Sequence, residues 1–263
     1  MQISGSTILL TGATGGIGHA IARALQARGG KLILTGRRSD VLEPLAAELG
    51  ARALSVDLSL PEELERLVNE AGQVDILVAN AALPATGTLD SFTMDEIDRA
   101  LDVNLRAPIA LARELSPSMI SRRSGHLCFM SSLSGKAATP QSAIYNATKF
   151  GLRGFASALR ADMRPHGVEV SAIFPGFIRD AGMFADSGAK LPAGVGTRSP
   201  EDVARATVRA IEQNRAEIDV APVALRLGSA FAGLAPEMSA SVSRRLGSEK
   251  VANDMAAAQN TKR

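Results

Sequence analysis

The 263-residue sequence has no tryptophan, a single tyrosine and a single cysteine. One cysteine excludes an internal disulfide, so a hydrophobic core must hold the fold together, and a reducing compartment fits. Cys128 lies in an apolar run, which indicates a buried strand residue rather than a reactive thiol. His19, His126 and His166 are scattered and lack the spacing of metal ligands, so no metal site is predicted.

Excess charge of one sign is also missing. Lys and Arg number 29 against 27 Asp and Glu, a formal net charge of +2, so no overall field favours nucleic acid. No stretch of about 18 uncharged apolar residues is present, so no membrane-spanning helix is expected. The first ten residues lack the basic start and apolar core of a secretory signal. We therefore expect a cytoplasmic protein without stable membrane insertion.

Short apolar runs alternate with longer segments of helical period. The predicted strands are residues 7–10, 31–35, 53–56, 74–79, 126–130, 168–174 and 217–220. Five helices are predicted at residues 17–28, 94–104, 107–122, 144–164 and 200–213, and Ser199 can cap the last of them. Two more follow the second and third strands; Ser39 or Asp40 can cap the first of these, and Pro61 begins the second. Such alternation is typical of an α/β fold: a doubly wound, Rossmann-like parallel sheet with helices on both faces. We predict one domain over residues 1–220, with residues 221–263 as its helical C-terminal extension.

A glycine-rich turn, Thr11-Gly-Ala-Thr-Gly-Gly-Ile-Gly18, follows the first predicted strand. Glycines let backbone N–H groups approach a diphosphate and let the next helix pack close to the strand. The helix N-terminus then faces the negative charge. No Lys-Ser/Thr pair follows, so the turn is not a P-loop. Alone it could be a tight loop, but the flanking strand and helix predict a dinucleotide site. Its residues are Gly12, Thr14, Gly16, Ile17 and Gly18.

The end of the second strand predicts which dinucleotide binds. An NAD site places a carboxylate there for the ribose 2′-hydroxyl, whereas this strand ends in Leu34-Thr-Gly-Arg-Arg38 with no acid until Asp40. Arg37 can instead pair with a 2′-phosphate, a charge-assisted contact worth about 1.5–3 kcal/mol. The plainer interpretation is two solvated arginines at a helix start, where positive charge is mildly unfavourable. We therefore expect NADP(H) as the cofactor.

The only tyrosine, Tyr145, lies four residues before Lys149, so the two share a helix face. A nearby ammonium lowers the pKa of a phenol, and a shift of about three units would bring Tyr145 close to neutrality for acid–base work. A Tyr–Lys pair at this spacing is more often an ordinary surface pair. Support comes from Ser132, thirteen residues earlier at the predicted end of the fifth strand, where its hydroxyl can bind a substrate oxygen.

With these motifs in order, the chain resembles a single-domain short-chain dehydrogenase/reductase over about residues 6–220. The carrying motifs are the T-G-x-x-x-G-x-G turn, Ser132 and Y-x-x-x-K. The resemblance implies that Tyr145 is the proton donor or acceptor and that Ser132 polarises the substrate oxygen. It implies that Lys149 binds the nicotinamide ribose and that Asn104 holds a water of the proton relay.

The same resemblance implies that Asp57 meets the adenine and that Asn80, Pro175 and Gly176 belong to the cofactor site. Six of the candidate residues fall at carboxyl ends of predicted strands, where ligands bind in open parallel sheets: Gly12, Arg37, Asp57, Asn80, Ser132 and Pro175. Two positions depart from the family pattern. The fourth-strand motif reads Ala79-Asn-Ala-Ala82 instead of N-N-A-G, and Asp180 stands where a threonine is common.

Residues 180–198 are expected to form the substrate loop, and their apolar side chains suit a small, moderately hydrophobic carbonyl compound or alcohol. The predicted reaction is therefore hydride transfer between the nicotinamide and such a substrate. A non-catalytic NADP(H) sensor or scaffold and a cofactor-retaining isomerase or epimerase are the alternatives. The resemblance implies a homodimer or homotetramer. The tail, with excess basic residues, suits helices over the cleft or against a neighbouring subunit, or contact with a membrane or partner.

Overall fold

A computed structural model of the chain describes residues 1–192, 195–245 and 248–259. Within these ranges seven strands form one parallel sheet in the order β3-β2-β1-β4-β5-β6-β7. The strands are β1 Thr7–Thr11, β2 Lys31–Gly36, β3 Arg52–Ser55, β4 Ile76–Ala79, β5 Gly125–Met130, β6 Val168–Pro175 and β7 Glu217–Val220. This order confirms the predicted doubly wound, Rossmann-like sheet, because the winding direction reverses between β1 and β4.

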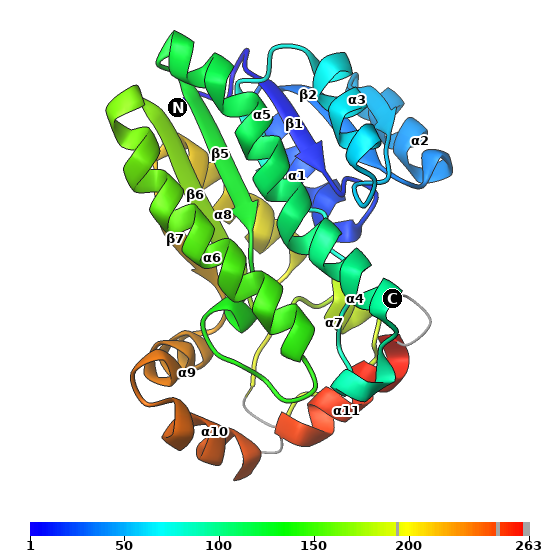
Figure 1. Ribbon diagram of the computed structural model, residues 1–263, viewed down its shortest axis with the longest axis vertical. Coiled ribbons are helices and arrows are strands. Elements are labelled where there is room, and N and C mark those ends of the chain that lie inside the picture. The colour runs from blue at the N-terminus through cyan, green and yellow to red at the C-terminus, as the bar shows by residue number, and fades with distance from the viewer. Residues whose placement is uncertain (193–194, 246–247, 260–263) are drawn as a thin grey trace.

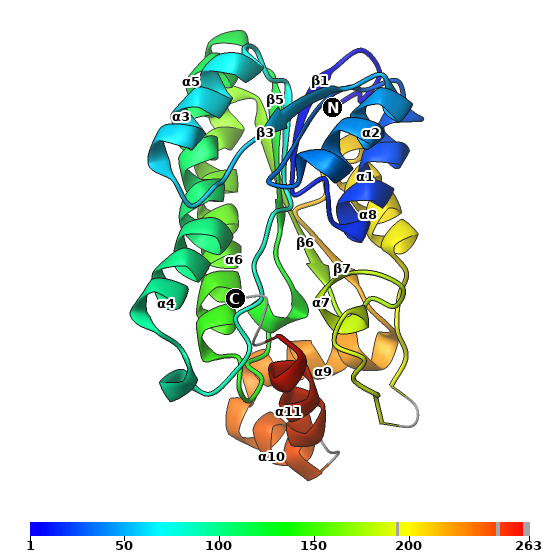
Figure 2. The same ribbon diagram turned by 90° about the vertical axis from the view of Figure 1, so that its right-hand side faces the viewer.

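Helices cover both faces of the sheet (Figure 2). On one face lie α1 (Gly16–Gln26), α2 (Ser39–Leu49) and α8 (Pro200–Glu212). On the other lie α3 (Pro61–Ala71), α5 (Ala107–Arg122) and α6 (Ala143–Met163), with α4 (Met94–Leu101) at the end of that layer. Four short helical turns lie in the connections between these elements: η1 Leu89–Ser91, η3 Leu133–Gly135, η4 Arg164–His166 and α7 Gly182–Ala185.

The core is divided by the sheet into two apolar clusters. In β1, Ile8 and Leu10 point into the cluster beneath α1, α2 and α8, whereas Leu9 points into the cluster beneath α3, α5 and α6. All three are fully buried. A strand buried on both faces needs apolar residues at every position, which explains why the sequence of β4 shows no polar alternation.

Helix starts agree with the sequence in two places and differ in one. Ser199 caps α8 and forms a capping box with Asp202, and Pro61 stands in the first turn of α3, both as predicted. The predicted cap of α2 by Ser39 or Asp40 is wrong. Arg38 is the N-cap residue, with an extended backbone, so Ser39 is already inside the helix and its hydroxyl donates to Ser55 Oγ.

The two helices predicted at residues 94–104 and 107–122 form a continuous helical segment. A π-helical turn, η2 (Asp102–Arg106), joins α4 to α5 and contains Asn104. A π-helical turn contains about one residue more than an α-helical turn, so it changes the direction of the side chains that follow. Such turns recur at functional sites.

The C-terminal helices α9 (Val223–Leu234), α10 (Pro236–Arg245) and α11 (Ser248–Gln259) lie beyond the carboxyl end of the sheet (Figure 1). Residues 246–247 and 260–263 of the predicted extension, and 193–194 of the predicted substrate loop, lie outside the described residues. In the described ranges, no helix combines the length and apolar character needed to cross a membrane.

The capping box of α8 generates a stability prediction. Ser199 is buried, its Oγ accepts a hydrogen bond from the Asp202 N–H at 3.3 Å, and Asp202 Oδ2 accepts one from the Ser199 N–H at 2.9 Å. Ser199→Ala should lower the free energy of unfolding by about 1 kcal/mol, since one helix N–H loses its partner. Urea denaturation measures the change, with Ser199→Thr as the control that keeps the capping oxygen. Equal losses in both variants would show that the cap is not the cause.

Candidate active site

A cavity of about 1550 Å³ opens at the carboxyl edge of the sheet, beside the ends of β1 and β4, between which the winding direction reverses. Ligands of open parallel sheets bind at such reversals of winding. The cavity is lined by every candidate residue of the sequence except Asn104, namely Gly12, Thr14, Gly16, Ile17, Gly18, Arg37, Asp57, Asn80, Ser132, Tyr145, Lys149, Pro175 and Gly176. Residues spread over the first 176 positions thus meet in one place.

The glycine turn leaves no room for side chains. Gly12 has φ +66°, and a Cβ there would lie 2.7 Å from the Cα of Ala81. A Cβ on Gly18 would lie 2.2 Å from the carbonyl oxygen of Gly12. Among the described residues, no side chain caps α1, and its first turn contains no acid. The first N–H groups of α1 are therefore available to an anion.

Asn80 ties the ends of β1 and β4 together. Its Nδ2 donates to the carbonyl oxygens of Thr11 (3.2 Å) and Gly12 (3.1 Å). In return, Thr11 Oγ1 accepts the backbone N–H groups of Asn80 (3.0 Å) and Ala81 (3.1 Å). Asn80 thus fixes the glycine turn, and Thr11 completes the tie. The sequence analysis missed Thr11, although its place directly before Gly12 in the motif was a signal.

Arg37 and Asp57 lie together at the far end of the cavity. The Arg37 side chain is 48% exposed, and its Nη1 lies 3.9 Å from Asp57 Oδ2. Arg99 Nη2 lies 3.4 Å from the same oxygen, while Ser59 donates to Asp57 Oδ1 through its N–H (3.0 Å) and Oγ (2.7 Å). Burial raises the pKa of Asp57, but the Ser59 hydrogen bonds and the two guanidinium groups outweigh it, so the net pKa is lowered. Asp57 is therefore a carboxylate.

Two contacts near Arg37 were not foreseen. Arg38 donates to the carbonyl oxygen of Thr14 and so links the end of β2 to the glycine turn. A Cβ on Gly36 would lie 2.7 Å from Thr14 Cγ2, so a side chain at this position would displace the side chain of Thr14. Neither contact has a signal in local sequence spacing, since β2 and the turn approach each other only in the folded sheet.

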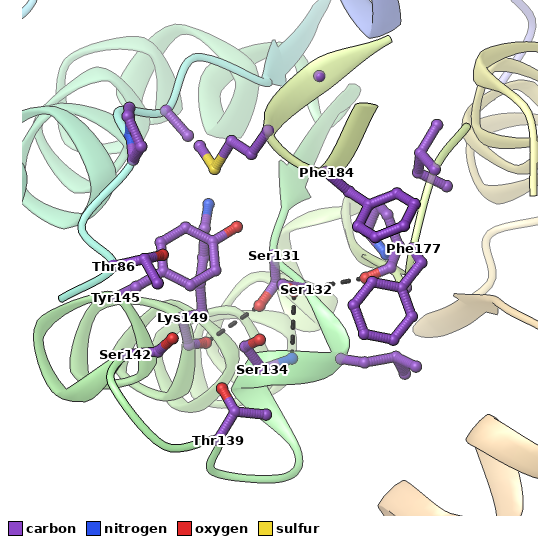
Figure 3. A pocket seen from close by; sticks show the side chains of 18 of the residues that line it. Thr86, Ser131, Ser132, Ser134, Thr139, Ser142, Tyr145, Lys149, Phe177 and Phe184 are labelled. Carbon is purple, nitrogen blue, oxygen red and sulfur yellow. Dashed lines mark hydrogen bonds between the residues drawn. The ribbon is translucent and has the colours of Figure 1, made fainter. Parts of the chain in front are cut away.

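Ser132, Tyr145 and Lys149 converge at the middle of the cavity (Figure 3). Ser132 follows β5, and its Oγ accepts the N–H of Ser134 at 3.1 Å and donates to the carbonyl oxygen of Pro175 at 3.4 Å. Tyr145 and Lys149 project from the first turns of α6. Because α6 begins beside the end of β5, the thirteen-residue connection returns Tyr145 to the strand end, as the sequence analysis expected.

Burial dominates the titration of the Tyr145–Lys149 pair. Lys149 is 1% exposed, its Nζ donates to the carbonyl oxygen of Met130 at 2.9 Å, and it lies 5.5 Å from the centroid of the Tyr145 ring. Burial lowers the pKa of Lys149 to about 8. Burial also raises the pKa of Tyr145 to about 12, and a hydrogen bond with Ser132 offsets this only in part. The expected lowering of the Tyr145 pKa by Lys149 is therefore absent here, because the ammonium points to Met130.

Asn104 is buried behind the cavity wall. Its Oδ1 accepts the N–H of Leu83 at 2.6 Å, and its Nδ2 donates to the carbonyl oxygen of Leu83 at 2.9 Å. Both polar groups of the side chain thus hold the loop that follows β4. Asp180, the second departure from the family pattern, has φ +69°, pairs with Arg179 at 3.2 Å and is absent from the cavity lining.

Lys136 is a site residue that the sequence analysis missed. It lines the cavity just after Ser132, and its Nζ lies 2.7 Å from Glu217 Oε2 and 2.6 Å from Asp219 Oδ1. This ion pair anchors the loop after β5 to β7. Residues of α9 and α11 also line the cavity. The sequence analysis expected tail helices over the cleft or against a neighbouring subunit, but the tail carries no motif that indicates which of its residues line the cavity.

Known proteins resemble this chain over most of its length. A family model described as short chain dehydrogenase matches residues 6–192. Ketoacyl reductase HetN of Nostoc sp. is 33% identical over 227 residues, 83% of this chain and 79% of HetN. Dehydrogenase/reductase SDR family member 7B of Xenopus laevis is 33% identical over 263 residues, 91% of this chain and 81% of that protein.

Among solved structures, a short-chain dehydrogenase from Sphingobium yanoikuyae in complex with NADPH superposes with a TM-score of 0.77 at 26% identity, covering 89% of this chain and 95% of that one. The family model spans most of the chain, and the relatives align over most of their lengths. The chain therefore belongs to the short-chain dehydrogenase/reductase family and is an oxidoreductase that uses a nicotinamide cofactor.

Proposed function

We propose that this protein is an NADP(H)-dependent oxidoreductase that transfers a hydride between the nicotinamide and a small-molecule carbonyl compound or secondary alcohol. One observation carries the proposal: Ser132, Tyr145 and Lys149 line the same cavity as the glycine turn. A site that only binds a dinucleotide needs the turn but has no need of a partly buried phenol beside a buried amine.

The residues present fit a dinucleotide. Gly12 and Gly18 exclude a Cβ, and the uncapped start of α1 offers N–H groups to a diphosphate. Asp57 would meet the adenine, while Pro175 and Gly176 would lie beside the nicotinamide. When bound, the nicotinamide supplies or accepts the hydride.

The end of β2 favours NADP(H) over NAD(H). Arg37 lines the cavity with a half-exposed guanidinium, and Gly36 before it has no side chain. The nearby Asp57 carboxylate is shared by Arg37 and Arg99. A 2′-phosphate would give Arg37 a second, stronger partner. The similar Sphingobium dehydrogenase, which was solved in complex with NADPH, agrees with this choice.

The protonation state of Tyr145 suits carbonyl reduction. With a pKa of about 12 the phenol is protonated at neutral pH, so it can donate its proton to the substrate oxygen as the hydride arrives at carbon. Ser132 Oγ, which lines the same cavity, would bind the same oxygen and polarise the carbonyl. Lys149 would bind the nicotinamide ribose, and Asn104 would position the loop after β4.

Other features stay predictions. The cytoplasmic location expected from the sequence pattern stays a prediction, and a homodimer or homotetramer rests on the family resemblance alone. No observation favours the alternative of a non-catalytic NADP(H) sensor or scaffold, and turnover by the wild type beside Tyr145→Phe separates it from an enzyme.

Removing the Tyr145 hydroxyl tests the reaction. Tyr145→Phe should lower kcat by about a hundredfold or more, because the substrate oxygen loses its proton donor. NADPH absorbance is followed with a panel of ketones, aldehydes and alcohols. NADPH affinity, measured by fluorescence titration, should stay within about threefold and serves as the control for folding. Turnover that survives in Tyr145→Phe would refute the catalytic assignment, and binding without turnover in either protein would favour the sensor.

Cofactor choice is tested at Arg37. Arg37→Ala should weaken NADPH binding by about ten- to a hundredfold, the worth of one charge-assisted contact, while NADH binding changes little. The control is Arg23→Ala on the exposed face of α1, where Arg23 pairs with Glu48 at 2.8 Å. Dissociation constants for both nucleotides decide the matter. If Arg37→Ala affects the two nucleotides equally, the guanidinium does not read the 2′-phosphate.

Burial of Lys149 predicts a stability change with pH. Its folded pKa of about 8 lies below the ordinary value of 10.5, so the unfolded state binds more protons between these pH values, and stability rises with pH there. Lys149→Met should therefore be more stable than the wild type by about 1–3 kcal/mol at pH 7, and the difference should vanish toward pH 10.5.

Urea denaturation at about pH 7, 8.5 and 10 measures this difference across the range in which the two states differ in bound protons. The matched control is Lys136→Met, which should be less stable than the wild type because it leaves Glu217 and Asp219 without their cation. A destabilised Lys149→Met at neutral pH would contradict the argument.

A further inference from the structure

The cavity is larger than a single ligand requires. Sites for one drug-sized molecule measure about 300–1000 Å³, whereas this cavity measures about 1550 Å³. Its cofactor residues line the part between the glycine turn and Tyr145. Beyond Tyr145 the cavity continues to the C-terminal helices, and this second part is called the substrate compartment. Six of its lining residues are Phe177, Phe184, Leu225, Phe231, Val251 and Met255.

The compartment is apolar on the sides that face Tyr145. Phe177 and Phe184, from β6 onward, lie across the cavity from Tyr145 (Figure 3). Their ring centroids are 5.0 Å apart, so they form one continuous aromatic surface. Leu225 and Phe231 of α9, with Val251 and Met255 of α11, extend this surface away from the reacting groups. A long apolar group attached to the reacting carbon would lie along it.

The charges in the lining exclude an anionic ligand group. Among the described residues beyond the cofactor part, the one cation is Lys136, and its ammonium is held by Glu217 and Asp219. Asp186 and Glu237 also line the cavity and carry negative charge. A phosphate or carboxylate group of a substrate would have no free cation to pair with among the described residues of this compartment. A neutral alkyl chain, in contrast, is transferred from water into it without an electrostatic cost.

Helix α11 is held across the mouth of the compartment at two points. Gln259, which is 2% exposed, donates through Nε2 to the carbonyl oxygen of Met183 in α7 at 3.2 Å. Gln141, in the loop before α6, donates to Asn253 Oδ1. Ala252, next to Asn253, is buried on the cavity side, whereas Ala257, between the two points, is exposed. The helix therefore spans from the loop next to Tyr145 to the segment that covers the glycine turn.

We propose that α11 forms a wall of the substrate site and that the compartment selects neutral carbonyl compounds or alcohols with an extended alkyl or acyl chain. This inference rests on the proposed function, because it takes Tyr145 as the reacting end. Each methylene buried against Phe177, Phe184 and α11 should raise affinity about fourfold until the compartment is full.

Ligand binding tests this without turnover. Tyr145→Phe saturated with NADPH is titrated calorimetrically with methyl ketones from butan-2-one to decan-2-one. The expected result is an affinity that rises about fourfold per methylene, with a heat capacity change that becomes more negative along the series. An affinity that stays flat with chain length would overturn the inference.

Variants of α11 test whether the alkyl chain of the ligand binds against this helix. In the same background, Ala252→Phe should fill the compartment and lower the affinity for decan-2-one by about tenfold or more while leaving butan-2-one within about twofold. Met255→Gln keeps the volume and should lower the decan-2-one affinity as well, in case Ala252→Phe does not fold. Ala257→Phe, the same substitution as the first on the exposed face of α11, is the control and should change neither affinity. If the cavity-side variants behave like Ala257→Phe, α11 is not a wall of the site.

The two proposals fail differently. If the wild type with NADPH turns over no ketone of any length while the chain-length series and the α11 variants behave as expected, the proposed reaction is overturned and the apolar selectivity stands. If ketones are reduced with no preference for chain length, the reaction stands and the inference on α11 is overturned.

Discussion

Parallel pairing of seven strands is the constraint on which the rest of this structure depends. It sends every strand in the same direction, so the residues that follow β1, β2, β4, β5 and β6 meet at one edge. The winding reverses between β1 and β4, which leaves a crevice there that no helix of the described ranges fills. Asn80 and Thr11 hold the two sides of that crevice at a fixed separation through four hydrogen bonds. The glycine turn keeps its conformation because this tie is in place.

Tyr145 and Lys149, which we propose as reacting groups, lie in surroundings that lower the stability of the fold. Lys149 is buried with one carbonyl oxygen as its hydrogen-bond acceptor, and Tyr145 is desolvated beside it. Elsewhere in the site, charges are paired: Lys136 has two carboxylates, and Asp57 has two guanidinium groups and Ser59. An amine buried with so few partners disfavours the folded state and keeps a titratable group near neutral pH, which is typical of acid–base sites.

The C-terminal helices change what the cavity can accept. The sheet and its loops would leave the cavity open beyond Tyr145, and α9 and α11 enclose that side with apolar residues. Gln259 and Asn253 connect α11 to α7 and to the loop before α6. A shift of α11 would therefore also displace these two segments, which lie on either side of Tyr145. In the function that we propose, the strand ends bind the cofactor and the tail selects the substrate.

The sequence by itself determined the features that depend on short spacing. The order of strands and helices followed from local periodicity. The glycine turn followed from the backbone room that Gly12 and Gly18 leave, and the Tyr145–Lys149 pair from the geometry of one helical turn. Each involves residues close in the chain, so local chemistry is enough to predict it.

Only the tertiary structure decided the contacts between distant segments. The partners of Asp57, the direction of the Lys149 ammonium and the closure of the cavity by α11 all join residues from different elements. The pKa of Tyr145 belongs with them. The sequence placed a lysine nearby and predicted a lower value, but burial raises the pKa of Tyr145, and the Lys149 ammonium donates to the carbonyl oxygen of Met130. Desolvation depends on everything that packs around a group, and spacing along the chain contains no measure of it.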